Sequence, residues 1–260
     1  MMERATHLPR TVWIGDLEID DVNPADARDR VLEWFATPGP GARRVVTPNA
    51  DYAVKARRDE AFRRALNSAD LRVPDGMWIV YASRIAGRPL RSTVTGRLLV
   101  PALATLCAEH DRSIGLFGAG PGVAEKAAAV LCARNPTLRV THAISPPMGL
   151  TPGSADDLAL VDRLRDDLPA VVFVGLGAPK QELWMEMHAE ALRGSILVGI
   201  GAGMDIIAGR FRAAPRWMTK VGLEWAFRLA QEPRRLARRY LVDDPWIVHW
   251  ALRTRFQHRP

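Results

Sequence analysis

The chain has 260 residues, of which 48% are hydrophobic and 25% charged, as is typical of a soluble globular protein. Its two cysteines, Cys107 and Cys132, lie in helical patterns without neighbouring ligand residues, so neither a disulfide framework nor a zinc site is expected. We expect neither secretion nor membrane insertion, because the N-terminus lacks an apolar signal core and no apolar run approaches the ~18 residues of a spanning helix.

The net charge of +7 is concentrated at the C-terminal end of the chain. Residues 206–260 hold 12 basic and 4 acidic side chains, a net charge of +8, whereas residues 1–205 hold 24 basic and 25 acidic ones. The segment 206–260 also carries four of the eight tryptophans: Trp217, Trp225, Trp246 and Trp250. Such an asymmetry is typical of a segment that meets an anionic surface, either lipid or nucleic acid.

The pattern of apolar and polar residues predicts alternating strands and helices. It predicts a hairpin over Thr11–Asp20, and Asn23 before Pro24 predicts the start of the first helix. Strands are expected near 43–47, 71–74, 113–118, 138–143, 170–175 and 195–200. Helices are expected near 24–35, 50–68, 76–87, 97–110, 121–134, 155–167 and 180–192. This alternation predicts an α/β fold with a Rossmann-like, mostly parallel sheet and helices on both faces.

After Ile200 the pattern changes to basic helices. Pro215 is expected to open a helix that runs to about Gln231, Pro233 to end it, and Pro245 to interrupt a second arginine-rich helix. We therefore predict a catalytic α/β domain at 1–205 and a basic helical C-terminal appendage at 206–260.

Polar residues follow three of the predicted strands at the point where each strand ends. Thr47 and Asn49 follow one, Asp75 follows another, and Gly177–Glu182 follows a third. In open α/β sheets the ligand crevice lies outside the carboxyl ends of the strands, so these groups are expected to converge on one rim. The alternative is structural, because threonine, asparagine and aspartate are also favoured as helix N-caps.

Gly118, Ala119 and Gly120 begin a glycine-rich loop between a predicted strand and a predicted helix. Backbone N–H groups of such a loop can approach a phosphate. The dinucleotide-binding pattern is incomplete, since its last glycine comes one position early and no acidic residue follows near position 140. A nicotinamide cofactor is therefore disfavoured, while phosphate binding and a plain tight turn both stay open.

The Gly177–Glu182 cluster and Asp205 are further candidates for ligand binding. Lys180 could neutralise a leaving phosphate and Gln181 could fix a sugar hydroxyl, or both form a solvated first helical turn. Asp205 either accepts a hydrogen bond from a nucleobase or ribose, or caps the next helix. The sequence has no D-x-D, H-E-x-x-H, G-x-S-x-G or Walker motif and its six histidines are scattered, so no metal site is expected.

Six motifs occur in order along the chain: Thr47-x-Asn49, Leu66-Asn67-Ser68-Ala69-Asp70-x-x-x-Pro74-Asp75-Gly76, Val94-Thr95-Gly96, Gly118-Ala119-x-Pro121-Gly122, Gly177-x-Pro179-Lys180-Gln181-Glu182-x-Trp184 and Gly201-x-Gly203-x-x-Asp205-x-x-Ala208-Gly209. Together, from about Trp13 to Trp246, they resemble the WecG/TagA/CpsF glycosyltransferase family, glycosyltransferase family 26. Six linked motifs are far more specific than any one of them.

The resemblance implies an inverting, metal-independent and cofactor-free glycosyltransferase on the cytoplasmic side of the membrane, bound peripherally to its inner face. It implies transfer from a UDP-sugar to a polyprenyl-diphosphate-linked saccharide in cell-surface polysaccharide synthesis, such as teichoic acid, enterobacterial common antigen or exopolysaccharide. N-acetylmannosamine, its uronic acid, glucuronic acid and glucose all stay open as the donor sugar. Asp75 is implied as the general base, with Thr47 and Gln181 in the same pocket, and Asn49 shares their rim. The predicted donor-binding residues are Gly118, Ala119, Gly120, Gly177, Pro179, Lys180 and Asp205.

The chain departs from the family pattern at two positions. The family often has arginine before Val-Thr-Gly and aspartate two residues after it, where this chain has Thr93 and Leu98. If the arginine contacts diphosphate, this chain must use another cation, with Arg91, Arg97 or a C-terminal arginine as candidates.

The C-terminal segment is expected to meet the acceptor's diphosphate or an anionic membrane surface, where each basic residue contributes about 1 kcal/mol. The residues proposed for this contact are Arg228, Arg234, Arg235, Arg238, Arg239, Trp246 and Trp250. The alternative is a solvated basic helix packed on the catalytic domain.

Three other functions are alternatives to this one: a nucleotide-sugar-binding oxidoreductase, a catalytically silent membrane-associated relative, and a nucleic-acid-binding module. The last rests on the basic segment alone and leaves the polar rim unexplained, so no nucleic-acid partner is expected. The sequence leaves the oligomeric state open, with a homo-oligomer among the options.

Overall fold

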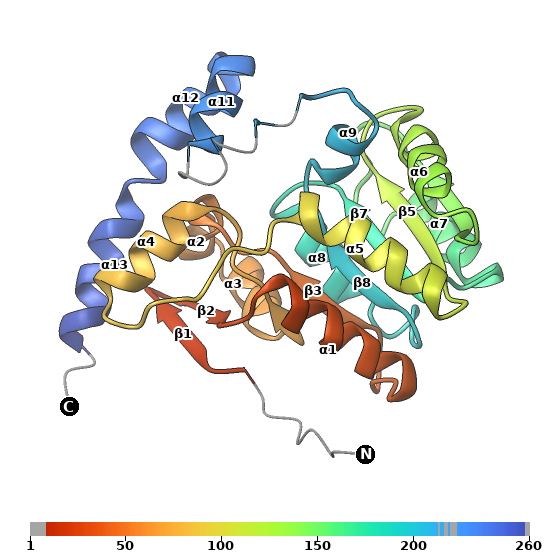
Figure 1. Cartoon of the computed structure of the whole chain (residues 1–260), viewed down its shortest axis with the longest axis horizontal. Coiled ribbons are helices and arrows are strands. Elements are labelled where there is room, and N and C mark those ends of the chain that lie inside the picture. The colour runs from red at the N-terminus through yellow and green to blue at the C-terminus, as the bar shows by residue number, and fades with distance from the viewer. Residues whose placement is uncertain (1–8, 213, 216–217, 219–222, 258–260) are drawn as a thin grey trace.

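The computed structural model describes residues 9–212, 214, 215, 218 and 223–257. Its eight strands are β1 (Thr11–Ile14), β2 (Leu17–Asp20), β3 (Arg43–Val46), β4 (Leu71–Arg72), β5 (Ser113–Gly118), β6 (Arg139–Ile144), β7 (Val171–Gly175) and β8 (Ile196–Gly199). Six of them form one sheet in the order β4-β3-β8-β7-β5-β6, with each neighbouring pair parallel (Figure 1). This confirms the predicted α/β fold and the predicted strand positions.

Helices cover both faces of the sheet, as predicted. They are α1 (Pro24–Ala36), α2 (Ala50–Arg58), α3 (Glu60–Asn67), α4 (Met77–Ile85), α5 (Gly96–Glu109), α6 (Val123–Arg134), α7 (Ala155–Asp166), α8 (Lys180–Met187) and α9 (Gly203–Ile207). Alternate residues of β7 show the two faces: Val171 and Phe173 pack with α1, α5 and α6, whereas Val172 and Val174 pack with α2, α3, α7 and α8. A central strand buried on both sides therefore has a continuous apolar sequence.

The predicted helix over 50–68 is wrong in one respect, because the segment forms two helices. Asp59 ends α2 and begins α3, with its side chain accepting a 2.9 Å hydrogen bond from the Phe62 N–H. Aspartate competes with helix continuation because its short side chain bonds to nearby backbone groups. The predicted start of α1 is confirmed, since Asn23 and Asp26 form a reciprocal capping box.

The predicted hairpin is confirmed as the antiparallel pair β1–β2, which lies apart from the main sheet. Val12 and Ile14 of β1 belong to the same hydrophobic cluster as Ile247 and Trp250 near the C-terminus. The last helix, α13 (Trp246–Gln257), runs beside α4 (Figure 1). The end of the chain is thus packed into the core formed by its beginning.

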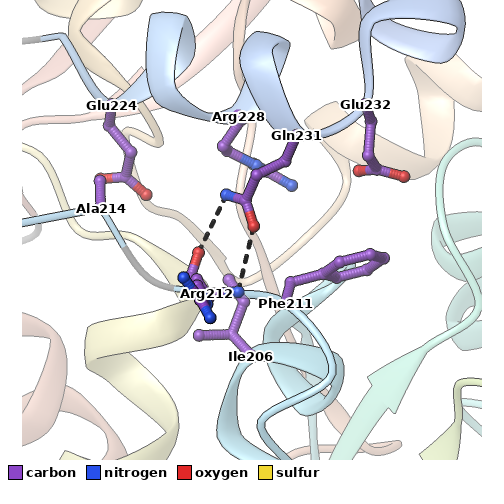
Figure 2. Close-up of a pocket in the computed structure, with 8 residues that line it drawn as sticks. All are labelled: Ile206, Phe211, Arg212, Ala214, Glu224, Arg228, Gln231 and Glu232. Carbon is purple, nitrogen blue, oxygen red and sulfur yellow. Dashed lines mark hydrogen bonds between the residues drawn. The ribbon is translucent and has the colours of Figure 1, made fainter.

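The C-terminal segment contains α11 (Glu224–Gln231), α12 (Pro233–Arg238), the π-helical turn η1 (Arg239–Asp243) and α13. Trp217 and much of the helix predicted to start at Pro215 lie outside the described residues. The Gln231 side chain bonds both backbone groups of Arg212, at 3.2 and 3.1 Å, and so fixes α11 against the segment that follows α9 (Figure 2). Pro233 begins a helix, as the preference of proline for a first helical position allows.

None of the helices in the described ranges is long and apolar enough to cross a membrane.

The contact between β5 and β7 generates a stability prediction. Gly118 has a φ of +127°, and a Cβ placed there would lie 2.5 Å from the backbone of Gly175. Gly122 has a φ of +74° but open space around it. Gly122→Ala should cost roughly 1–2 kcal/mol of unfolding free energy, the left-handed penalty alone. Gly118→Ala should cost clearly more, because a steric clash with the backbone adds to that penalty. Urea unfolding of both variants measures the difference, and equal costs would contradict the observed β5–β7 contact.

Candidate functional site

Two connected cavities open at the carboxyl ends of β3, β4, β7 and β8. The first, which we call the polar cleft, has an empty volume of about 900 Å³ and is defined by Thr47, Tyr52, Lys55, Arg97, Gly177 and Gly201. The second, which we call the aromatic pocket, has an empty volume of about 710 Å³ and is defined by Met77, Trp78, Thr93, Leu98, Trp225 and Tyr240. Both are lined by the same six residues, the shared wall: Asn49, Asp75, Thr95, Glu224, Arg228 and Arg239.

The structure thus brings Thr47, Asn49, Asp75 and Gly177 together at one rim. It achieves this because the parallel strands β3, β4 and β7 all end on the same side of the sheet.

Asp75 lies on the shared wall, just after the two-residue strand β4. Its N–H donates to the Pro48 carbonyl at 3.0 Å, and the Pro74 carbonyl accepts from the Val94 N–H at 2.7 Å, so the backbone on both sides is fixed. The structural alternative of an N-cap does not apply, because Gly76 occupies the N-cap position of α4 and no side chain caps that helix. The half-buried carboxylate instead faces both cavities.

Burial raises the pKa of Asp75 to about 6, since the charged form loses water contacts. The positive charge of Arg228, the hydrogen bond from Asn49 and the charge of Arg239 oppose that rise. The negative charge of Glu224 adds to it. Asp75 therefore ionises near neutral pH, in the range where a carboxylate can both hold and release a proton.

Asn49 combines a structural and a site role. Its Oδ1 caps α2 by accepting from the Tyr52 N–H at 3.2 Å, and its Nδ2 donates to Asp75 Oδ2 at 3.4 Å. Arg239 Nη2 donates to Asn49 Oδ1 at 3.3 Å. Thr47 Oγ1 donates to the Gly199 carbonyl at 3.2 Å and so ties β3 to β8 at the floor of the polar cleft.

Four cationic side chains line the polar cleft: Lys55, Arg97, Arg228 and Arg239. Lys55 Nζ lies 2.7 Å from Asp51 Oδ2 and 3.1 Å from the Ala178 carbonyl. Arg97 lies 3.5 Å from Glu224. Arg91, the other cation considered near Thr93, is engaged elsewhere by Asp21 and Asp26 and does not line either cavity.

Lys55 was missed by the sequence analysis. The signal was present, because Asp51 and Lys55 are four residues apart on the helix that begins after Asn49 and so share one face.

Gln181 lies beneath the polar cleft rather than in it, which differs from its expected position against a sugar. Its side chain is fully buried, its Oε1 accepts from the Gly201 N–H at 2.9 Å, and its Nε2 donates to Glu182 Oε1 at 2.6 Å. The Tyr52 hydroxyl donates to the same Glu182 oxygen at 2.6 Å. Burial raises the pKa of Glu182 to about 7. These three side chains hold the loop after β8 against α2.

The predicted donor residues Ala119, Gly120, Lys180 and Asp205 lie around a separate depression, the outer pocket, which Arg210 also lines. Gly118, the other residue predicted in the glycine-rich loop, ends β5 and does not line this pocket. The Ala119 N–H is already used, since it donates to the Gly175 carbonyl at 2.8 Å. Asp205 pairs with Arg210 at 3.3 Å. Ala202 lines both the outer pocket and the polar cleft, so the two adjoin. Gly177 and Pro179 form the turn before α8, with a cis bond at Ala178–Pro179.

The C-terminal arginines divide into two groups. Arg228 of α11 and Arg239 of η1 reach the shared wall, whereas Arg234 and Arg238 are exposed outside it. The side chain of Arg235 lies outside the described part of the structure. The same segment supplies Glu224, Trp225, Tyr240 and Asp244 to the aromatic pocket. These four residues were not predicted from the sequence as site residues, because only the tertiary structure places them near Asp75.

The two C-terminal tryptophans proposed for membrane contact lie in different environments. Trp246 is 54% exposed, whereas Trp250 is 9% exposed and packs against Gly15 with the Arg57 guanidinium over its ring. The expectation that the Trp250 ring contacts the lipid headgroups of a membrane therefore does not fit this structure. The N-terminal hairpin and α2 already cover that ring.

The site thus combines a carboxylate of raised pKa with four cationic side chains, at the carboxyl ends of the strands of an α/β sheet. Residues 12–260 match the model of the WecG/TagA/CpsF glycosyl transferase family, and the chain belongs to this family. Membership of this family makes the chain a glycosyltransferase. It decides against the two alternatives of an oxidoreductase and a nucleic-acid-binding module.

Two bacterial transferases are similar to this chain in sequence over most of their length. An N-acetylglucosaminyldiphosphoundecaprenol N-acetyl-beta-D-mannosaminyltransferase of Bacillus spizizenii is 27% identical over 195 residues, which cover 75% of this chain and 73% of the relative. A protein of the same name from Staphylococcus aureus strain MW2 is 26% identical over 229 residues, 87% of each chain.

The raised pKa of Asp75 generates a prediction about stability. The folded-state pKa of about 6 lies above the ordinary 3.8, so the carboxylate destabilises the fold above pH 6 and this effect vanishes below pH 3.8. Asp75→Asn should therefore raise the melting temperature at pH 8 and leave it unchanged near pH 3.5. Differential scanning fluorimetry at both pH values tests this, with Asp166→Asn at an exposed position of α7 as the control. A lowered melting temperature at pH 8 would show that the charge stabilises the fold.

Proposed function

We propose that this glycosyltransferase moves a sugar from a UDP-sugar to a polyprenyl-diphosphate-linked saccharide, with inversion at the anomeric carbon. The position of Asp75 between the polar cleft and the aromatic pocket carries the proposal. A donor in one cavity and an acceptor in the other would place the acceptor hydroxyl next to this carboxylate. The activities after which the relatives are named favour N-acetylmannosamine as the sugar and N-acetylglucosaminyl-diphosphoundecaprenol as the acceptor.

Asp75 serves as the general base in this proposal. It removes the proton of the acceptor hydroxyl while that oxygen attacks the anomeric carbon and the bond to the UDP oxygen breaks. Asn49 holds one carboxylate oxygen, which leaves the other for the substrate. A positioned general base typically contributes about 10²–10⁴-fold in rate.

The departing diphosphate gathers negative charge, which must be met inside the polar cleft. The four cations of the polar cleft supply this charge, and the first turn of α5 adds the positive end of a helix dipole at Gly96 and Arg97. These groups support a reaction that needs no metal ion. They also take the place of the family arginine that is absent at Thr93.

Gly120, Lys180 and Asp205 in the outer pocket are proposed to bind the nucleoside end of the donor, because the outer pocket adjoins the polar cleft at Ala202.

The exposed Arg234, Arg238 and Trp246 are proposed to contact an anionic leaflet on the cytoplasmic side, as a tryptophan beside basic residues suits a headgroup layer. This arrangement would bring a lipid-linked acceptor to the shared wall, where Arg228 and Arg239 lie.

Asp75→Asn should lower the turnover number by about 10²–10⁴-fold, since it removes the proton acceptor while preserving the shape of the side chain. The wild-type rate should fall on the acid side with an apparent pKa of about 6, because the base must be ionised. Transfer is followed with a synthetic prenyl-diphosphate acceptor, and unchanged UDP binding by calorimetry serves as the folding control. Near-normal turnover would remove Asp75 from the mechanism.

Transfer should keep at least half of its rate in excess EDTA, because protein cations rather than a metal ion face the diphosphate. The same acceptor assay measures it, with and without added Mg²⁺ or Mn²⁺. Loss of activity that either ion restores would contradict the metal-independent proposal.

A screen of UDP-linked N-acetylmannosamine, its uronic acid, glucuronic acid and glucose identifies the donor. UDP binding without transfer of any of them would favour the catalytically silent alternative.

A further inference from the structure

Asp244 is a buried carboxylate for which the proposed reaction has no direct use. It follows η1, its side chain is 2% exposed, and its Oδ1 has no hydrogen-bond partner among the described residues. Burial of a carboxylate costs free energy unless a charged partner offsets the loss of water contacts. The partner here is Arg239, whose Nε lies 3.8 Å from Asp244 Oδ2.

The π-helical turn η1 brings these two side chains together. The Asp244 N–H donates to the Arg239 carbonyl at 2.7 Å, a bond between residues five apart instead of the four of an α-helix. In a regular α-helix, side chains five residues apart point about 140° away from each other, because each residue turns by about 100°. The wider turn therefore allows the carboxylate to face the guanidinium that precedes it.

Arg239 connects this contact to the site. Its Nη2 donates to Asn49 Oδ1 at 3.3 Å, and Asn49 Nδ2 donates to Asp75 Oδ2 at 3.4 Å. The Tyr52 N–H donates to the same Asn49 oxygen at 3.2 Å, so the amide presents its Nδ2 to the carboxylate. A chain of contacts therefore runs from Asp244 through Arg239 and Asn49 to Asp75.

Two other carboxylates near Asp244 have cations of their own. Asp51 lies 4.0 Å from Arg239 but only 2.7 Å from Lys55. Asp243, the neighbouring carboxylate of the turn, faces an exposed arginine of α12 at 3.8 Å. Asp244 is thus the group best placed to hold Arg239.

We propose that Asp244 is a positioning residue, which holds the Arg239 guanidinium against Asn49 and thereby keeps Asp75 ionised and oriented. This inference rests on the proposed function, in which Asp75 is the base. Asp244 does not touch the substrate in this proposal and acts only through Arg239.

Electrostatics explain how the effect reaches Asp75. Burial raises the pKa of Asp75, the positive charges of Arg228 and Arg239 lower it, and the negative charge of Glu224 raises it. An opposite charge nearby favours the ionised form of a carboxylate. Loss of Arg239 from its place would therefore raise the pKa of Asp75 further and leave less of the base ionised at neutral pH.

The Asp244 carboxylate itself titrates near neutral pH. Burial raises its pKa from 3.8 to about 7, against the positive charges of Arg239 and Lys55 and with the negative charges of Asp51 and Asp243. Its charge is therefore present above pH 7 and is lost as the pH falls through that value. The hold on Arg239 weakens with it.

The pKa of Asp75 in the free protein tests the proposal without any sugar transfer. NMR titration of protein labelled with ¹³C in its aspartate carboxyl groups measures it, and the signal is assigned by its absence in Asp75→Asn. Asp244→Asn should raise this pKa by roughly half a unit to one unit, because Arg239 leaves Asn49, and Arg239→Gln should raise it similarly. Asp243→Asn, the same change at the adjacent carboxylate, is the matched control and should leave it unchanged.

A double-mutant cycle shows whether Asp244 acts through Arg239. Asp244→Asn added to Arg239→Gln should have no further effect on the pKa of Asp75, because the group that it holds is gone. Asp244→Ser gives the same comparison with a smaller polar side chain, and melting temperatures show which variants are folded. An unchanged or lowered pKa in the folded Asp244 variants, or an equal further shift in the double variant, would overturn the proposal.

A transfer assay separates this inference from the proposed function. With the prenyl-diphosphate acceptor, Asp244→Asn should lose turnover roughly 3- to 10-fold at neutral pH, since the base is less ionised and less well placed. The acid side of its rate profile should move to higher pH, whereas Asp243→Asn should match the wild type. A raised Asp75 pKa in a protein that transfers no sugar supports the positioning role and rejects the proposed function. Normal transfer with an unmoved Asp75 pKa in Asp244→Asn does the reverse.

Discussion

The burial of one carboxylate sets the electrostatic character of this site. Asp75 follows a strand of only two residues, and hydrogen bonds from its own N–H and to the Pro74 carbonyl fix the turn that presents it. Water is partly excluded from the carboxylate, so its pKa rises to about 6 despite the nearby Arg228 and Arg239. A carboxylate of this kind is a stronger base than an exposed one, yet it stays ionised at neutral pH.

The C-terminal segment supplies the surroundings that give Asp75 this character. Arg228 and Glu224 extend from α11, which Gln231 fastens to Arg212, and Arg239 comes from η1. The core packing of α13 against α4 and the hairpin anchors the far end of the segment. Side chains of this basic segment line both cavities together with residues that precede position 205.

Beneath the polar cleft, a buried polar network sets the shape of the floor. Glu182 accepts from Tyr52 and from Gln181, and Gln181 in turn holds the Gly201 N–H. The network joins α2, α8 and the loop after β8, which are the elements that carry Lys55, the Gly177 turn and the cleft's glycines. The hydrogen bonds to Glu182 Oε1 and to the Gly201 N–H hold these elements together, while Glu182 Oε2 is buried without a hydrogen-bond partner among the described residues.

The layers, most strand positions and the rim at Thr47, Asn49 and Asp75 could be predicted from the sequence. Hydrophobic periodicity shows where each strand ends, and the carboxyl ends of parallel strands lie at one edge of the sheet. The break between α2 and α3 at Asp59 was not predicted, because no proline or glycine lies there. Only the tertiary structure decided that Gln181 turns inward, that Trp250 is buried, and that Glu224, Trp225 and Tyr240 complete the site. Those outcomes depend on which distant segments pack together. The apolar pattern of a segment shows that one face is buried but does not identify the segment that covers it.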